Sequence, residues 1–170
     1  MMNRLVVVGL MGMIGSCGKP AAEKAAAPME ASSLFGKLET TATKDEVMVT
    51  LELLAGKAEP AFLGVLVNAE PSGAGACYLI AEVATGKARL VNDSGSGSQE
   101  LGDKAAVSNR QCELKAAGTR LDRSGGRLEV HFGVAFQKGF AGRKQLFGIA
   151  MDGNGAGRGL EPGRAFVVAK

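Results

Sequence analysis

The sequence predicts an all-β protein, an antiparallel sandwich of seven to nine short strands, on the basis of three observations. Apolar residues recur at every second position in several segments. Glycine-rich clusters separate these segments, and glycine supplies 25 of the 170 residues. No segment after residue 40 has helical periodicity over more than ten residues. Strict alternation is typical of a strand with one buried face, so many short strands favour a sandwich, with a closed barrel as the alternative.

Two segments show the alternation most clearly. In 128–136 every second residue from Leu128 is large and apolar, whereas Glu129 and His131 occupy the intervening positions. The segment 47–54 alternates in the same way from Val47. We expect further strands at 62–67, 77–83, 88–91, 145–151 and 164–168. Turns are expected where Gly, Asn, Asp and Ser gather, at 85–87, 92–98, 123–126 and 152–159.

The first 16 residues have the organisation of a secretory signal peptide. Arg4 supplies a positive charge, and residues 5–15 are apolar or glycine throughout. As a helix, this apolar segment would extend about 16 Å. A membrane-spanning helix needs roughly 20 residues, so we expect a signal helix over residues 1–16 rather than a transmembrane segment.

The end of this segment, Ile14-Gly15-Ser16-Cys17, resembles the lipobox of bacterial lipoproteins, with Ile and Gly in place of the commoner Leu and Ala. In that family the cysteine thiol receives a diacylglyceryl group, and the signal peptidase then cuts before it. The resemblance implies that Cys17 is lipidated and that membrane lipid is its partner, held almost irreversibly by several acyl chains. Gly18, where Asp often signals inner-membrane retention, favours the outer membrane. Ordinary secretion is the alternative.

Residues 17–33 are expected to form the lipidated cysteine and a flexible tether. The segment is small and polar, contains Pro20 and Pro28, and has no apolar stripe to bury. The sandwich domain is expected over residues 34–170, where the period-two patterns lie.

Cys77 and Cys112 are the other two cysteines of the chain. Secretion would place them in an oxidising compartment, where paired cysteines form disulfides. Closing a loop of this length stabilises a fold by about 3.8 kcal/mol in the chain-entropy model. Two buried free thiols are the alternative. A zinc site is disfavoured because the chain has a single histidine to add to this pair.

The stretches 76–95 and 108–155 are similar to a module found in secreted and surface proteins of environmental bacteria. The shared features are Cys-Tyr-Leu at 77–79, Leu-Val-Asn-Asp at 90–93, Asn-x-Gln-Cys at 109–112, Phe-Ala-Gly-x-Lys at 140–144 and Ala-x-Asp at 150–152. The resemblance implies an immunoglobulin-like sandwich and supports a Cys77–Cys112 bridge, but it assigns no catalytic or binding residue. The aromatic residues that the module usually carries are replaced here by SGSQ at 96–99 and GRGLEPG at 157–163.

Catalytic groups are sparse in the sequence. His131 is the single histidine, so a Ser-His-Asp or Cys-His site would have to use it. It occupies an outward strand position and no Gly-x-Ser-x-Gly elbow accompanies it, which predicts an exposed or sheet-packed side chain. Glu113, Asp122 and Glu129 are candidates for paired carboxylates, but no pair is marked by its context. We therefore expect no catalytic site and no cofactor.

Basic residues gather in the last part of the chain. Residues 104–170 hold 12 Lys or Arg against 5 Asp or Glu, although the net charge is only +3. That charge, without an aromatic stacking set, argues against nucleic acid as a partner. If they converge on one face, an anionic glycan, lipid phosphate or envelope protein would fit the candidate anion-binding residues Arg120, Arg123, Arg127, Arg143 and Lys144. A mixed, solvated surface is the alternative.

Asp152 and Asn154 lie in a glycine-rich loop and are the candidates for a calcium site. A flexible turn is the alternative, because the loop lacks the acidic density of an EF-hand. No other metal site is expected.

Taken together, these features predict a lipid-anchored protein of the cell envelope whose β-sandwich is non-catalytic and has a binding or structural role. A carbohydrate- or anionic-polymer-binding module serving a partner enzyme is the alternative, and it predicts an aromatic platform on the surface. A hydrolase with an unrecognised site is the third possibility.

Overall fold

The computed structural model describes residues 34–42, 47–54, 59–154 and 157–169. The predicted signal peptide, Cys17 and the predicted tether therefore lie outside the described residues. Within them, the only helical element is a single 3₁₀ turn, η1. No helix long and apolar enough to cross a bilayer is found in this described part of the chain.

Eleven strands make up the described domain. In chain order they are β1 (Phe35–Ala42), β2 (Val47–Leu53), β3 (Phe62–Asn68), β4 (Cys77–Glu82), β5 (Ala88–Val91), β6 (Ser98–Glu100), β7 (Ala106–Ser108), β8 (Cys112–Ser124), β9 (Arg127–Phe136), β10 (Gly142–Met151) and β11 (Gly157–Val168), with η1 (Lys138–Phe140) before β10.

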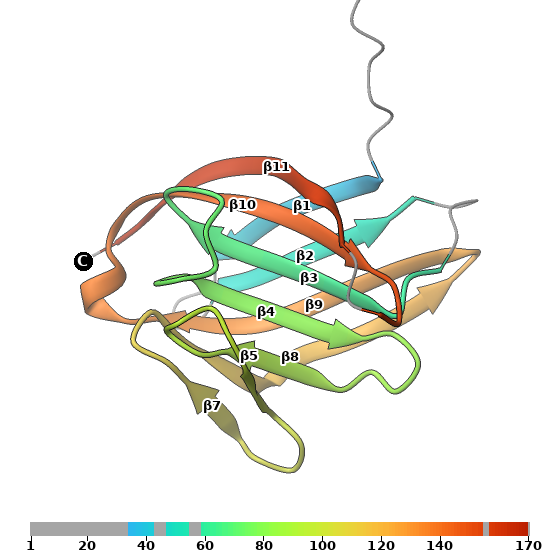
Figure 1. The fold of residues 1–170 in the computed structure, drawn as a ribbon, viewed down its shortest axis with the longest axis horizontal. Coiled ribbons are helices and arrows are strands. Elements are labelled where there is room, and N and C mark those ends of the chain that lie inside the picture. Colours follow the sequence, from blue (N-terminus) through green and yellow to red (C-terminus); the bar gives the residue numbers. More distant parts are fainter. Residues whose placement is uncertain (1–33, 43–46, 55–58, 155–156, 170) are drawn as a thin grey trace, which may run out of the picture. The chain divides into compact units, whose positions relative to one another are not determined.

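The strands form two antiparallel sheets that pack face to face, as Figure 1 shows. The five-stranded sheet has the order β1-β2-β9-β8-β7, and the six-stranded sheet has the order β11-β10-β3-β4-β5-β6. The predicted sandwich is thus confirmed. Its strands number eleven among the described residues, more than the seven to nine expected.

The core lies between the sheets and follows the predicted alternation. Each of the central strands sends every second side chain inward, and the largest fully buried side chains include Leu51, Leu79, Leu114, Phe132 and Leu146. Burial of such side chains stabilises the fold by about 1.5–3 kcal/mol each. On the outer face of the six-stranded sheet, Leu66, Phe147 and Ile149 form a second apolar cluster, whereas the outer face of the five-stranded sheet carries polar groups.

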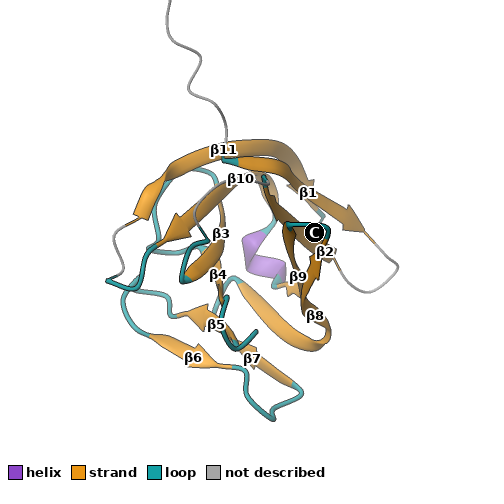
Figure 2. Ribbon diagram, turned by 90° about the vertical axis from the view of Figure 1, so that its right-hand side faces the viewer, coloured by secondary structure: helices purple, strands orange, loops and turns teal. Residues whose placement is uncertain are grey.

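Contacts between the sheets also form along both sides of the sandwich (Figure 2). On one side, the amide of Leu34 donates to both carboxylate oxygens of Glu161 at 3.0 and 3.1 Å. Leu38 of β1 packs against Gly163 of β11, where a Cβ would lie 2.5 Å from the leucine side chain. On the other side, Nε2 of Gln99 donates to the carbonyl of Ser108 at 3.0 Å.

A disulfide joins Cys77 of β4 to Cys112 of β8 and so links the two sheets through the core. The predicted pairing is therefore present in the structure. Beside it, Nδ2 of Asn109 donates to the carbonyls of Ala76 and Val91, at 3.2 and 3.0 Å. Its Oδ1 accepts the amides of Gln111 and Cys112, both at 2.9 Å. The Asn-x-Gln-Cys motif thus has a structural role.

The strands absent from the prediction are β1, β6, β7 and β8. β6 and β7 have three residues each, too few to show a period. In β8 the alternation is interrupted, because residues 116–119 bulge between the partners Lys115–Gly133 and Arg120–His131. β11 begins at Gly157, inside the predicted turn 152–159, because its first residues pair with the end of β10.

Candidate functional site

Polar side chains form two cross-strand rows on the outer face of the five-stranded sheet. In one row, Glu39, Thr50, His131 and Arg120 follow one another across β1, β2, β9 and β8. The neighbouring row is Lys37, Glu52, Glu129 and Asp122, on the same four strands. Because directly opposed residues on one face are close, the register alone brings all eight side chains together.

His131 lies at the centre of these rows and is almost fully buried, with 9% of its surface exposed. Its Nδ1 lies 3.2 Å from Oγ1 of Thr50. Its Nε2 lies 3.3 Å from Asp122 Oδ2 and 3.5 Å from Glu129 Oε1. Carboxylates only accept hydrogen bonds, so Nε2 carries the proton and Nδ1 accepts from the hydroxyl of Thr50.

A bulge in β8 lies beside His131 in the ladder. The bulge of residues 116–119 directly precedes Arg120, the strand partner of His131. Thr119 holds the bulge in place, since its hydroxyl donates to the Lys115 carbonyl and accepts the Gly133 amide at 3.0 Å. Gly133 is required below it, because a Cβ there would lie 2.1 Å from the carbonyl oxygen of Ala117.

Electrostatics keep the imidazole neutral. Burial of the ring, reinforced by the positive charge of Arg120, lowers the pKa of His131 below its ordinary 6.5, against the opposite effect of Glu129 and Asp122. Lys37 sits at the edge of the cluster, 3.2 Å from Glu39 and 3.8 Å from Glu129. Its hydrogen bond to Glu39 raises the pKa of Lys37.

The hydroxyl, imidazole and carboxylate of Thr50, His131 and Asp122 are connected in the manner of a catalytic triad. A nucleophile must reach its substrate, however, and Thr50 is only 4% exposed in the middle of β2. We interpret the connection as a buried hydrogen-bond network that fixes the packing of β2, β9 and β8. His131 is thus the sheet-packed residue that the sequence allowed as one of two alternatives.

The carboxylates Asp122 and Glu129 are brought together, although the sequence marked no pair. They are strand partners and line one open cavity of about 370 Å³. Two carboxylates on one cavity are the minimum for glycoside hydrolysis. Here Asp122 is held by Arg120 at 2.8 Å, and both carboxylates contact His131. Glu113 pairs with Ala135 and lies further along the β8–β9 ladder.

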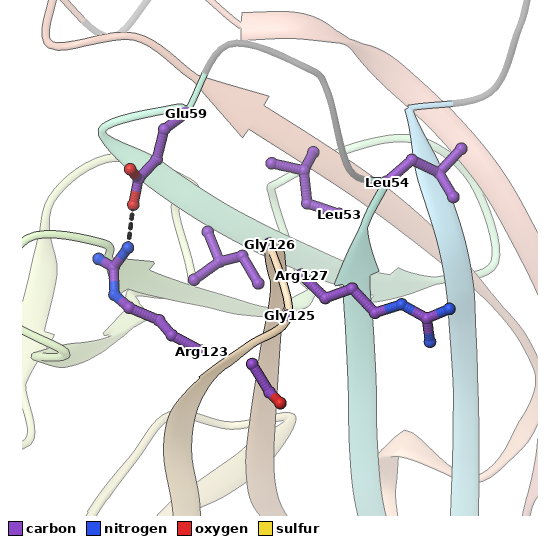
Figure 3. Close-up of a pocket in the computed structure, with 9 residues that line it drawn as sticks. Leu53, Leu54, Glu59, Arg123, Gly125, Gly126 and Arg127 are labelled. Atoms are coloured by element: carbon purple, nitrogen blue, oxygen red, sulfur yellow. Dashed lines mark hydrogen bonds and ion pairs between the residues drawn. The ribbon is translucent and has the colours of Figure 1, made fainter.

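A second cavity, of about 340 Å³, lies at the β8–β9 turn (Figure 3). Gly125 and Gly126 form the turn, with φ of 57° and 79°, as two-residue hairpins require. Arg123 and Arg127 project to opposite sides of this turn. Arg123 is bound by Glu59 and the Val83 carbonyl.

The five candidate anion-binding residues do not form one face. Arg120, Arg123 and Arg127 belong to the β8–β9 hairpin, and each is paired with a carboxylate, that of Asp122, Glu59 and Glu52 respectively. Arg143 and Lys144 begin β10, and within the described ranges no carboxylate lies within 4.0 Å of either. The condition that these residues converge on one face is therefore not met, because β8 and β9 belong to the five-stranded sheet and β10 to the six-stranded sheet. Anion binding at these residues stays a prediction.

The calcium candidates close a turn. Oδ1 of Asp152 accepts the amide of Asn154 at 2.9 Å, an Asx turn. Across the residues that are described, no group of three His, Cys, Asp or Glu side chains is placed to hold a metal ion. Calcium binding at this loop stays a prediction.

Sequence reasoning missed Thr50 and Lys37 as members of the cluster. The signal for Thr50 was present, because the alternation of 47–54 places it outward beside Glu52. The signal for Lys37 was absent, since β1 itself was not predicted. No family model matches this chain, and no curated protein or solved structure does either. The likeness to an immunoglobulin-like surface module therefore remains a prediction.

Proposed function

We propose that the protein is an envelope lipoprotein, anchored by acyl chains on Cys17, whose β-sandwich domain has a non-catalytic binding or structural role. The observation that carries the proposal is the sequence Ile14-Gly15-Ser16-Cys17 at the end of a short apolar segment. The anchor would tether the domain to a membrane surface without a spanning helix. Gly18 after the cysteine favours the outer membrane.

The cysteine chemistry of the domain supports this proposal. Disulfides persist in oxidising compartments and are rare in the cytosol, and Cys77 and Cys112 are joined in the core. Their pairing leaves Cys17 as the third cysteine of the chain, available for a thioether.

The site geometry supports a non-catalytic role. The histidine has both ring nitrogens engaged, and the hydroxyl beside it is buried. The two carboxylates that line the neighbouring cavity are paired with cations, Asp122 with Arg120 and Glu129 with Lys37.

Metabolic labelling with a palmitate analogue tests the anchor. The wild-type protein should carry the label and sediment with membranes, whereas Cys17→Ser should carry none. The matched control is the double variant Cys77→Ser/Cys112→Ser, which removes the other two thiols and should remain labelled. A labelled Cys17→Ser protein, or an unlabelled wild-type protein with an unmodified amino terminus, would contradict the proposal.

One observation favours the second candidate, a carbohydrate-binding module. On the outer face of the six-stranded sheet, the ring of Tyr78 lies against Gly64, where a Cβ would be 3.2 Å from Cε2. The half-buried side chains of Phe62 and Ile80 lie on the same face, on neighbouring strands. A flat aromatic ring of this kind can stack on a sugar. Co-sedimentation with insoluble cell-wall polysaccharide tests it, with Tyr78→Ala expected to lose binding and Tyr78→Phe to keep it.

A further inference from the structure

Unpaired cations and an exposed apolar side chain meet at the end of the sandwich where β10 begins and β11 finishes (Figure 1). Arg143 and Val167 are direct partners in the β10–β11 ladder, so their side chains are neighbours on one face. Val167 is 73% exposed, more than any other large apolar side chain of the described residues. We name Lys138, Arg143, Lys144 and Val167 the β10–β11 end surface.

A small aromatic cluster packs against Lys144, one of the cations of this surface. Nζ of Lys144 lies 4.0 Å from the centroid of the Phe140 ring, a favourable cation–π contact. Phe136 contacts both Phe140 and Phe166, with centroids 5.8 Å apart in each case. Phe166 is the strand partner of Lys144. Lys144 therefore projects from a packed base, whereas Arg143, the preceding residue of β10, lies with Val167 on the other face of the strand.

The charges of the β10–β11 end surface are not neutralised by the domain. In the described part of the molecule, no ion pair involves Lys138, Arg143 or Lys144. The three arginines of the β8–β9 hairpin are all paired. An outside anion therefore meets three available cations at this end.

We propose that the β10–β11 end surface docks onto the phosphate-bearing headgroups of the membrane that carries the lipid anchor; this rests on the proposed lipoprotein function. Arg and Lys attract anionic headgroups, and an apolar side chain among them inserts at the headgroup boundary. A soluble polyanion would use the cations alone. The exposed Val167 is what favours a lipid surface.

The length of chain before the domain permits this contact. Sixteen residues lie between Cys17 and Leu34, the first described residue, so the two positions are 17 residue steps apart (34 − 17 = 17). At full extension they reach about 55 Å. Strand β1 of eight residues spans about 27 Å, so an anchor at Cys17 leaves the far end of the sandwich within reach of the bilayer.

The test uses the lipidated protein reconstituted in vesicles of phosphatidylcholine alone or mixed with phosphatidylglycerol. Amide hydrogen exchange is measured in the segment 137–144 and, as an internal reference, in the turn 83–87 between β4 and β5. We expect exchange in 137–144 to slow only on the anionic vesicles. Arg143→Gln should lower the docked-to-free ratio about fivefold, and Val167→Ser should also lower it. Arg127→Gln, an exposed arginine on the β8–β9 hairpin, is the matched control and should change nothing.

Equal exchange on both vesicles, or equal effects of Arg143→Gln and Arg127→Gln, would overturn the proposal. The proposal would also be overturned if Val167→Ser docked as well as the wild-type protein and soluble polyphosphate displaced both from the vesicles. That result would identify a soluble polyanion as the ligand. A protein that leaves the vesicles altogether would refute the anchor itself, and the docking proposal with it. Equal urea midpoints for all variants exclude unfolding as the cause.

Discussion

Oγ1 of Thr50 and Nδ1 of His131 lie 3.2 Å apart in the middle of the five-stranded sheet. The contact joins β2 to β9, and the other ring nitrogen extends the connection to Asp122 on β8. Three strands thus share one buried polar network. A buried polar group without a hydrogen-bond partner destabilises the fold. Each side chain of the network therefore needs its partner.

Replacing Thr50 by valine should destabilise the protein by about 1–3 kcal/mol, because it leaves Nδ1 of His131 buried without a donor. Urea unfolding measures the loss. Thr50→Ser is the matched control, since it keeps the hydroxyl and should be affected less. Equal losses in the two variants would mean that the methyl group, and not the hydrogen bond, stabilises the sheet.

Stability should fall on acidification below about pH 6.5. Burial and then Arg120 lower the pKa of His131 in the folded protein below the ordinary 6.5. The unfolded chain therefore binds this proton more readily, and the free energy of unfolding decreases as the pH drops from 6.5 towards the folded pKa. Above pH 6.5 the imidazole is neutral in both states and contributes no slope.

Urea midpoints measured between about pH 5.5 and 7.5 test this pH dependence, in the range where histidine titrates. His131→Gln should be nearly flat over this range, because it removes the titrating group. A wild-type slope that persists unchanged in His131→Gln would assign the effect to another group.

The disulfide should contribute strongly to stability. Cys77 and Cys112 are 35 positions apart, and closing a loop of that length is worth about 3.8 kcal/mol in the chain-entropy model. Reduction should lower the urea midpoint of the wild-type protein accordingly. The double variant Cys77→Ala/Cys112→Ala should not respond to reductant, and a response there would point to a different cause.

Gly133→Ala should be destabilising by about 1–3 kcal/mol, because the new Cβ would collide with the backbone of the β8 bulge. Gly139→Ala is the matched control, since nothing lies within 4 Å of a Cβ at that position. Thermal unfolding of the two variants distinguishes them. If Gly133→Ala unfolds at the wild-type temperature, the bulge does not lie over β9 as described.

Asn109→Ala should cost about 3 kcal/mol, since it removes the partner of four backbone groups beside the disulfide. Asn154→Ala, in an exposed loop, should change stability little. Urea unfolding compares the two. Similar small effects would show that water replaces the Asn109 side chain without loss.

Local patterns in the sequence were enough to predict the sandwich, because burial of one strand face leaves a period of two that can be read without any partner. The segment 128–136 matches β9 closely for this reason. The segments 62–67 and 88–91, predicted as apolar runs between turns, match β3 and β5. The pairing of Cys77 with Cys112 could also be predicted from the sequence, because these two cysteines are the pair that remains if Cys17 carries the lipid.

Only the tertiary structure decided which outward residues meet. Register between strands places Thr50 opposite His131 and Glu129 opposite Asp122. That register depends on turns and bulges, such as the bulge at 116–119, whose geometry the local pattern does not give. The division of the strands into two sheets separates Arg143 and Lys144 from the hairpin arginines, which their proximity in the sequence did not reveal. Periodicity reports which face a side chain occupies, whereas contact across strands is a property of the assembled sheet.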